Sequence, residues 1–184
     1  MIDALQKAMH RQPVHVHPYE ALSGTGGPPI LDTCTDPHLE IYLDGSAEGS
    51  GDDGVAAWGF RIVANVPLQL CQPVEMVDGK NFIVFKRYGR VVRNPASHLY
   101  VGATRETNNT GEISAFIEAM IFVLFETKRA SDYAMAFVFD SLLSGSQIVG
   151  HWDISDDSVN VQLARTAHAL WRALKRRHPP IFGS

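Results

Sequence analysis

Apolar and polar side chains alternate in two neighbouring stretches of the chain. Residues 39–44, Leu-Glu-Ile-Tyr-Leu-Asp, have the period of two that is typical of a strand. Residues 55–66 form a second stretch that is rich in β-forming side chains. Between them, residues 45–54 contain four glycines and two serines, which favour a turn. We therefore expect two adjacent antiparallel strands.

Three further stretches are candidate strands. The region from residue 67 to residue 98 is interrupted by Pro67, Pro73 and Pro95, so its regular elements must be short. Within and after it, short runs of β-forming residues recur, and a buried apolar run precedes Asp140. We expect strands over residues 81–88, 99–103 and 133–139.

Two other stretches have the helical period. One begins near Asn109 or Thr110, either of which could cap it, and continues to about residue 128. The other covers residues 161–177 and ends in three basic residues, which suits a helix C-terminus. Their apolar positions are Ile113, Phe116, Ile117, Met120, Ile121, Leu124 and Phe125 in the first, and Leu163, Ala167, Leu170, Trp171 and Leu174 in the second. The order strand, strand, strand, helix, strand, helix predicts a mixed α/β domain.

The first 38 residues differ from the rest of the chain. They contain five prolines and three glycines, a density that breaks regular structure. We expect a short helix followed by an arm or linker over residues 1–38, and one domain over residues 39–184. His15 and His17 could ligate a metal, but no cysteine or carboxylate completes a set, so a solvated arm is the simpler interpretation.

The composition is that of one globular domain. The chain has 184 residues, of which 45% are hydrophobic, and this excludes wholesale disorder. Its two cysteines exclude a disulfide framework and favour a reducing compartment, so we expect an intracellular protein of the cytoplasm or nucleus. The net charge of -4 excludes a uniformly basic nucleic-acid-binding protein. No apolar run is long enough to span a membrane.

One segment nevertheless carries a strong local charge. Residues 80–105 include six basic residues and no Asp or Glu; the six are Lys80, Lys86, Arg87, Arg90, Arg93 and Arg105. Such a segment could contact a phosphate backbone. Equally, its cations could protect an exposed edge strand from pairing with another chain. The sequence leaves both interpretations open.

Three carboxylates stand at positions suited to metal binding. Asp44 and Asp140 each follow an apolar strand, and Glu112 lies in the first turn of a helix. If the two strands are neighbours, their ends lie about 4.8 Å apart, and like charges that close need a cation between them. Oxygen ligands of this kind suit Mg²⁺ or Mn²⁺. Two such ions about 4 Å apart could support phosphodiester chemistry.

Each acid also has a structural interpretation. Asp44-Gly45 is a common turn, and Glu112 could simply favour the helix dipole. Asp140 could cap the turn that follows it. The metal-binding hypothesis therefore depends on the surroundings of the three acids.

Those surroundings resemble the type 1 ribonuclease H family, including the ribonuclease H domains attached to reverse transcriptases. The similarity extends from about residue 39 to the end, without the middle insertion. It rests on Tyr42-Leu43-Asp44-Gly45-Ser46, Trp58-Gly59-Phe60, Thr107-Asn108-Asn109-Thr110-Gly111-Glu112, Asp140-Ser141 and the helix with Leu163 and Trp171, all in the family's order.

The resemblance implies a ribonuclease H-like α/β fold, a mixed sheet whose first three strands are antiparallel, with flanking helices. It implies that Asp44, Glu112 and Asp140 are catalytic carboxylates that bind two Mg²⁺ or Mn²⁺ ions. The reaction would be endonucleolytic hydrolysis of the RNA strand of RNA–DNA hybrids. One ion would activate a water and the other would stabilise the leaving 3′ oxygen.

The resemblance also implies substrate contacts. Asn108 and Asn109 would touch the minor groove of the hybrid, where the 2′-hydroxyl distinguishes RNA from DNA. Ser46 and Thr107 would lie near the substrate backbone. The full set of implied substrate-binding residues is Ser46, Thr107, Asn108, Asn109 and Ser141.

The chain departs from the family in three places. The family's basic substrate-binding protrusion beyond the fourth strand is not evident, since residues 150–160 carry Asp153, Asp156 and Asp157 instead. The chain also has an insertion at about residues 67–98, and it stops at Ile181-Phe182, where the family's fifth strand should begin. The C-terminal strand and the helix with a fourth Asp are then lacking. We expect a partner chain or a missing C-terminal segment to complete the sheet. An alternative is a catalytically impaired or inactive ribonuclease H-like domain that binds nucleic acid or a partner chain, and a third is an unrelated scaffold protein whose acids only form turns.

Overall fold

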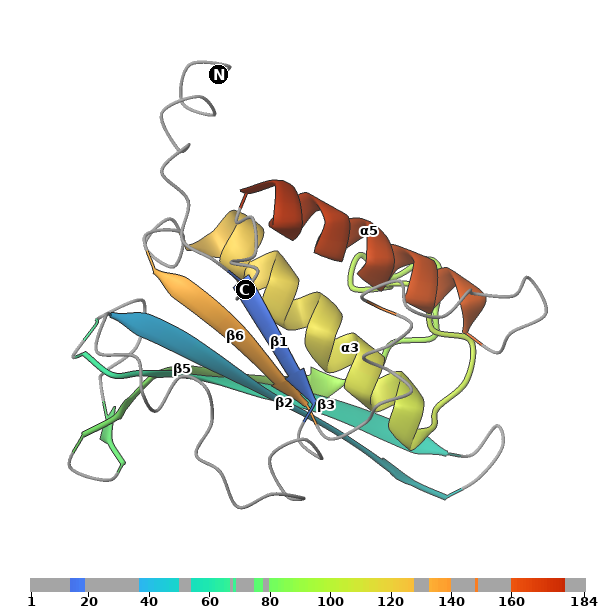
Figure 1. Ribbon diagram of the computed structural model, residues 1–184. Coiled ribbons are helices and arrows are strands. Elements are labelled where there is room, and N and C mark those ends of the chain that lie inside the picture. Colours follow the sequence, from blue (N-terminus) through green and yellow to red (C-terminus); the bar gives the residue numbers. More distant parts are fainter. Residues whose placement is uncertain are drawn as a thin grey trace.

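The computed structural model describes residues 14–18, 37–49, 54–66, 68, 75–77, 80–127, 133–139, 148 and 160–177. These residues form one sheet with helices on one of its faces (Figure 1). The strands are β1 (Val14–Pro18), β2 (His38–Glu48), β3 (Val55–Ala64), β4 (Glu75–Met76), β5 (Phe82–Arg90) and β6 (Ala134–Phe139). The helices are α3 (Asn108–Ile121), the π-helical turn η3 (Phe122–Glu126) and α5 (Val161–Arg177).

The sheet is mixed, with six strands in the order β1-β6-β2-β3-β5-β4. Strands β2 and β3 are antiparallel, and β5 pairs antiparallel with β3. Strand β6 lies parallel to β2, with Tyr42 opposite Val138. The prediction of a ribonuclease H-like mixed sheet whose first three strands are antiparallel is confirmed. The third of these strands is β5, which lies inside the segment that was expected to be an insertion.

The segment expected to be an arm contributes a strand. Val14–Pro18 pairs parallel with β6, from Val14 opposite Met135 to Pro18 opposite Phe139. This strand lies at the sheet edge that was expected to stay open for a partner chain or a C-terminal segment. Its valines at alternate positions favour the extended conformation, and these five residues form a strand of the sheet where an arm was expected. The partner chain and the domain boundary at residue 38 stay predictions.

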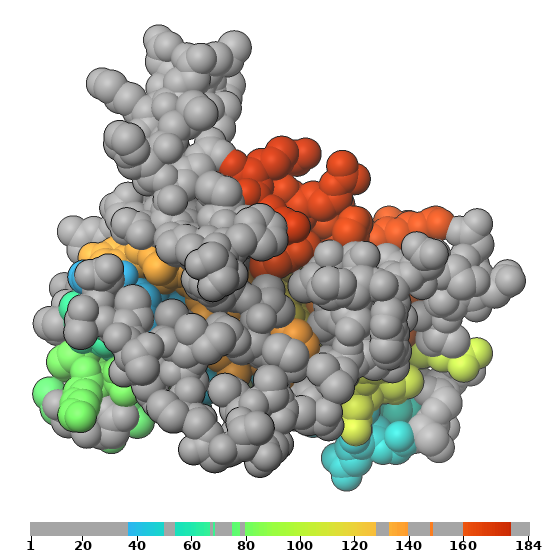
Figure 2. Space-filling view, in the orientation of Figure 1, coloured from blue at the N-terminus to red at the C-terminus, as the bar shows by residue number. Residues whose placement is uncertain are grey.

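Both helices lie on the same face of the sheet, and α3 lies between the sheet and α5 (Figure 1). The apolar side of α3 is fully buried, and Phe116 stacks on Phe137 of β6 at 5.8 Å between ring centroids. Trp171 of α5 reaches the same Phe137 edge-on at 5.9 Å. In the space-filling view α5 lies at the surface (Figure 2). The predicted inward positions of α5 are buried at Leu163, Ala167, Trp171 and Leu174, and Leu170 is partly buried.

Three local predictions are wrong. The strand expected over residues 99–103 does not form, because Gly102 has a φ of 112° and a turn at Asn94–Ser97 precedes it. The turn expected from residue 45 begins later, since β2 continues to Glu48 through pairing with β3. The cap of α3 is Thr107 and not Asn109 or Thr110.

Some predictions lie outside the described residues. These are the N-terminal helix, Asp140, Ser141 and the start of a strand at Ile181-Phe182. Within the described part of the chain, the structure contains no helix that is long and apolar enough to cross a membrane.

Candidate active site

Asp44 lies inside strand β2 and not at its end. It pairs with Gly59 of β3, and its side chain is exposed. Its neighbour Leu43 is buried in the core beneath the helices, so the alternation of the strand places Asp44 on the opposite face of the sheet. That face has a cavity of about 630 Å³, lined by Tyr42, Leu43, Asp44, Gly59, Phe60, Arg61, Lys86, Arg87, Tyr88, Val138 and Phe139.

Two glycines bring the start of α3 into direct contact with the strand that contains Asp44. A β-carbon added at Gly45 would overlap the backbone of Gly111 and Glu112. A β-carbon added at Gly111 would lie 2.5 Å from the carbonyl oxygen of Ala57 and 3.1 Å from Cα of Gly45. Only glycine permits this approach. The contact places the backbone of Glu112 directly beside the residue that follows Asp44.

The third predicted carboxylate lies outside the described residues, but the strand that leads to it is described. Strand β6 ends at Phe139, immediately before Asp140 in the sequence. Its register brings Val138 opposite Tyr42, and Phe139 lines the same cavity as Asp44. The end of β6 and the middle of β2 therefore meet at this cavity, as the pairing of strands in the sequence analysis required.

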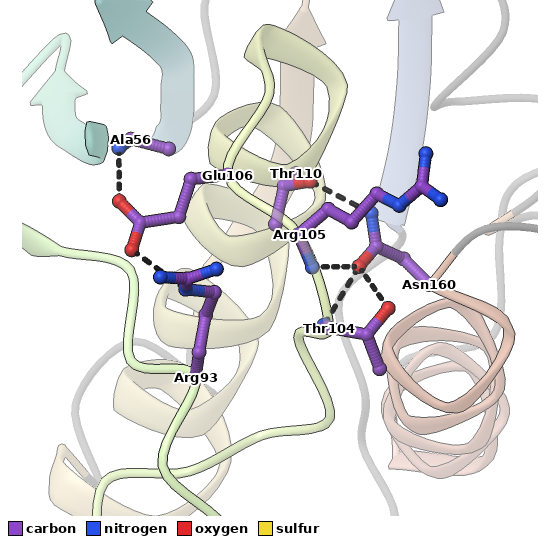
Figure 3. Close-up of polar contacts among 7 residues, drawn as sticks. All are labelled: Ala56, Arg93, Thr104, Arg105, Glu106, Thr110 and Asn160. Carbon is purple, nitrogen blue, oxygen red and sulfur yellow. Dashed lines mark hydrogen bonds and ion pairs between the residues drawn. The ribbon is translucent and has the colours of Figure 1, made fainter. Parts of the chain in front are cut away.

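The loop before α3 is held on its β3 side by Glu106. One carboxylate oxygen of Glu106 accepts a hydrogen bond from the backbone nitrogen of Ala56 at 2.6 Å (Figure 3). The other oxygen forms an ion pair with Nε of Arg93 at 3.0 Å. The side chain of Glu106 is only 10% exposed, so these contacts are shielded from solvent. They attach the loop to the start of β3.

The same loop is held on its other side by Asn160, directly before α5. The side-chain oxygen of Asn160 accepts hydrogen bonds from the backbone nitrogens of Thr104 at 2.8 Å and Arg105 at 3.1 Å, and from the Thr104 hydroxyl at 3.1 Å (Figure 3). Its side-chain nitrogen donates to the hydroxyl of Thr110 at 2.7 Å. Asn160 is 3% exposed and has a φ of 61°. One buried side chain thus joins α5, the loop and the first turn of α3.

The described members of the predicted substrate-binding set lie at or beside the start of α3. The hydroxyl of Thr107 caps the helix by accepting a hydrogen bond from the Thr110 nitrogen at 3.2 Å. Asn108 is exposed and Asn109 is half-buried, while Ser46 is exposed on β2 next to the glycine contact. In Figure 2 the start of α3 and the adjoining end of β2 and β3 lie together at the surface. A large substrate can reach these side chains.

Two of the three predicted carboxylates, Asp44 and Glu112, lie among the described residues. Carboxylate oxygens are the ligand type that Mg²⁺ and Mn²⁺ prefer, so these side chains could hold such an ion. Among the described residues, no group of three or more His, Cys, Asp or Glu side chains is close enough to hold a metal ion. A metal site built from the predicted carboxylates would need a ligand from outside the described residues, and Asp140 follows the end of β6 in the sequence.

The basic segment is partly neutralised by acids from elsewhere in the chain. Ion pairs between described residues join Lys86 to Glu75 at 3.4 Å, Arg87 to Glu126 at 2.5 Å and Arg93 to Glu106 at 3.0 Å. The pair at Arg93 supports the loop before α3. These three cations therefore have structural partners within the chain, and two of them, Lys86 and Arg87, lie on β5.

Sequence reasoning missed the residues that position the site. Asn160 and Glu106 were not singled out, and Gly111 appeared only as one member of the motif that ends at Glu112. A signal for Asn160 was present, since Asn directly before an apolar helical pattern is a common cap. The partners of Glu106 are distant in sequence, at Ala56 and Arg93, and no local pattern indicates them.

Comparison with known proteins gives similarity at the level of structure. The sequence matches no protein-family model and no curated protein. Its structural neighbours are type 1 ribonucleases H. The RNase H1 of the halophilic archaeon Halobacterium salinarum is 23% identical with a TM-score of 0.45, covering 78% of this chain and 80% of that one.

Two further solved structures are similar to a comparable extent. The N-terminal RNase H domain of Rv2228c from Mycobacterium tuberculosis is 16% identical with a TM-score of 0.45, covering 77% of this chain and 78% of that one. LC11-RNase H1, isolated from compost by a metagenomic approach, is 18% identical with a TM-score of 0.46, covering 78% and 85%. An association with reverse transcriptases stays a prediction.

Proposed function

We propose that this chain is a metal-dependent endonuclease that hydrolyses the RNA strand of RNA–DNA hybrids. The observation that supports this most directly is the contact between Gly45 and Gly111, which brings Glu112 to the strand that contains Asp44. Opposed glycines let a helix pack closely on a strand, and here that packing brings the backbone of Glu112 beside the residue that follows Asp44. The close approach is useful if the two carboxylates must act together.

The residues of the chain then have separate tasks. Asp44, Glu112 and Asp140 would hold two Mg²⁺ or Mn²⁺ ions. When bound, such ions supply activation of a water and stabilisation of charge at the leaving 3′ oxygen. Asn108 and Asn109, at the surface of the first turn, would contact the minor groove and its 2′-hydroxyl groups. Glu106 and Asn160 would hold the loop in place before substrate binds, so that less ordering is needed on binding.

Cleavage of a hybrid labelled separately on each strand tests this proposal. We expect the chain to cut the RNA strand in Mg²⁺ or Mn²⁺ and to leave the DNA strand intact. Asp44→Asn, Glu112→Gln and Asp140→Asn should each lower the rate by roughly 100-fold or more, because each removes a charged ligand. The matched control is Glu48→Gln, since Glu48 is an exposed acid on the same strand, four residues further along. Its rate should stay within about twofold of the wild type, as for a surface substitution.

A second measurement reports metal binding without catalysis. Mn²⁺ should raise the melting temperature of the wild type and of Glu48→Gln, because a ligand that binds the folded state stabilises it. It should raise that of Asp44→Asn much less. Cleavage that persists in a chelator, unchanged activity of Asp44→Asn, or hybrid binding by the wild type with no turnover would each contradict the proposal.

A further inference from the structure

A second cavity lies on the helix side of the sheet, away from the exposed face of Asp44. It has a volume of about 320 Å³ and lies between β5, the segment that follows β5, and the middle of α3. The residues that line it include Trp58, Arg90, Val91, Val101, Ser114 and Glu118. A volume of this size is at the lower end of the range for small-molecule sites. It suits one planar ring system.

The α3 wall of this cavity has polar groups whose hydrogen-bonding capacity is not used. Ser114 is 1% exposed, and its hydroxyl oxygen has no hydrogen-bond partner. Such buried unpaired groups are rare in folded proteins. Glu118 lies one helical turn further along the same side of α3. Burial raises the pKa of Glu118, and the nearby guanidinium of Arg87 only partly offsets this.

Arg87 is not available to satisfy either group fully. Its two terminal nitrogens donate to the two carboxylate oxygens of Glu126, at 2.7 Å and 2.5 Å. The ion pair fixes the guanidinium at the edge of the cavity. A hydroxyl and a carboxyl group thus face a space in which a ligand could supply both a donor and an acceptor.

The aromatic wall is fixed in place. The indole nitrogen of Trp58 donates to the carbonyl oxygen of Arg90 at 3.2 Å. A β-carbon at Gly89 would lie 2.7 Å from Cζ2 of Trp58, so the strand has no side chain where the indole lies. The ring therefore cannot easily turn to fill the cavity. Val91 and Val101 add apolar surface, and Leu99 is 56% exposed.

We infer that this cavity binds a nucleobase. A base offers a flat apolar face to the indole and valine walls, and it has donors and acceptors along its edge for Ser114 and Glu118. Arg90 is exposed and lines the cavity, where a guanidinium can meet the phosphate of the same nucleotide. The inference rests on the proposed function if the base belongs to a nucleic-acid strand. A free nucleotide has the same chemistry and is the other source.

Binding in metal-free buffer with chelator tests the inference apart from cleavage. The probes are the four common ribonucleoside monophosphates, ribose 5-phosphate, and a labelled single-stranded oligonucleotide with and without one abasic position. We expect saturable binding of a nucleotide and no comparable binding of ribose 5-phosphate. The Ser114→Ala variant should bind the nucleotide roughly 5- to 15-fold more weakly than the wild type, because it lacks one hydrogen bond. Weaker binding of the abasic oligonucleotide would assign the base to a strand. Binding of the free nucleotide alone would assign the site to a free ligand.

Two variants serve as controls for this test. Ser114→Ala should be no less stable than the wild type, because the hydroxyl it removes has no partner. Asp44→Asn should bind the nucleotide as the wild type does while losing cleavage. Equal binding of ribose 5-phosphate, no binding of any nucleotide or oligonucleotide, or unchanged binding by Ser114→Ala would overturn the inference. None of these outcomes would affect the cleavage result, so the two proposals fail separately.

Discussion

The first turn of α3 and the middle of the same helix are built in opposite ways. At the first turn the backbone touches β2 through two glycines, and the hydroxyls of Thr107 and Thr110 are both hydrogen-bonded. One and two turns later, Ser114 has no partner and Glu118 faces a cavity. The fold therefore fixes the positions of side chains at the first turn before any ligand binds, whereas in the middle of the helix it leaves hydrogen-bonding groups that a ligand could use.

Preorganisation of this kind suits chemistry that depends on charge placement. Carboxylates that hold cations must be positioned before the substrate arrives, because reorganisation during reaction costs rate. A cavity with unused donors and acceptors instead gains stabilisation only when it is filled. Substitutions at the first turn should therefore lower both stability and cleavage, whereas substitutions at the cavity should mainly change ligand binding.

The largest effect is expected where the glycine contact is broken. Gly45→Ala would place a methyl group against the backbone of Glu112, which cannot move without displacing the start of α3. We expect a loss of at least about 3 kcal/mol in the free energy of unfolding, the upper range for overpacking, and loss of hybrid cleavage. Urea denaturation measures the free energy of unfolding, and the cleavage assay measures activity on the hybrid.

Gly59→Ala is the matched control. Gly59 pairs with Asp44 in the sheet, yet its added β-carbon would lie 3.7 Å from Cβ of Tyr88, an ordinary contact. This variant should fold with a change of less than about 1 kcal/mol. Equal tolerance of alanine at both positions would refute the role assigned to the contact at Gly45.

A smaller effect is expected at Asn160. Asn160→Ala removes four hydrogen bonds and leaves an alanine at a positive φ, so the loss should be roughly 2–4 kcal/mol. Asn160→Asp keeps the acceptor and loses only the donor to Thr110, so it should cost about 1 kcal/mol. Thermal unfolding of both variants checks the order. The loop would not depend on Asn160 if alanine cost no more than aspartate.

The smallest effects on stability are expected at two acids, Glu118 in α3 and Glu126 in η3. The stability contributions of the two acids should depend on pH with opposite signs. Burial raises the pKa of Glu118 above its ordinary value of 4.5, so the folded state binds more protons than the unfolded state above that pH. The free energy of unfolding then falls as pH rises through this window. Glu118→Gln should be more stable than the wild type at pH 7, and the difference should vanish below pH 4.5.

Glu126 should behave in the reverse sense. Its hydrogen bonds from Arg87 lower its pKa below 4.5, so its stabilising contribution is present above 4.5 and is lost as pH falls through the lowered pKa. Glu126→Gln should be less stable than the wild type at pH 7 and should converge with it in acid. Denaturation of the wild type, Glu118→Gln and Glu126→Gln between pH 3 and pH 7 measures both pH dependences. If both variants were more stable, or both less stable, than the wild type at pH 7, the predicted difference between the two acids would be wrong.

Much of the fold was predictable from local patterns. Residues 161–177 form a helix with the predicted ends, and the strands at residues 55–66, 81–88 and 133–139 formed within about two residues of their predicted limits. These elements have strong periodicity, and their burial agrees with it. The failure at residues 99–103 has a local cause, since a β-forming run contains Gly102 in a conformation that no strand adopts.

The sequence indicated the acidic residues of the candidate site, but it did not indicate the residues that hold the loop before α3 in place. Asp44 and Glu112 have a recognisable sequence context, and their positions as catalytic residues stay predictions. The supports depend on contacts across the chain, such as Glu106 with Ala56 and Asn160 with Thr110. Strand β1 was missed for the same reason, because its partner is more than a hundred residues away. Only the folded chain shows these pairings.

The pairing of β1 with β6 has a consequence for synthesis on the ribosome. Val14 is made before Met135, its partner in the sheet, and 121 residues separate the two positions. At roughly 5–20 residues per second, the first strand waits on the order of 6–25 s for its neighbour to emerge. Parallel pairing across such a span forms slowly even afterwards, since a long loop must close first. During this delay the backbone groups of β1 have no partner in the sheet, and unpaired strands of this kind can pair with other chains.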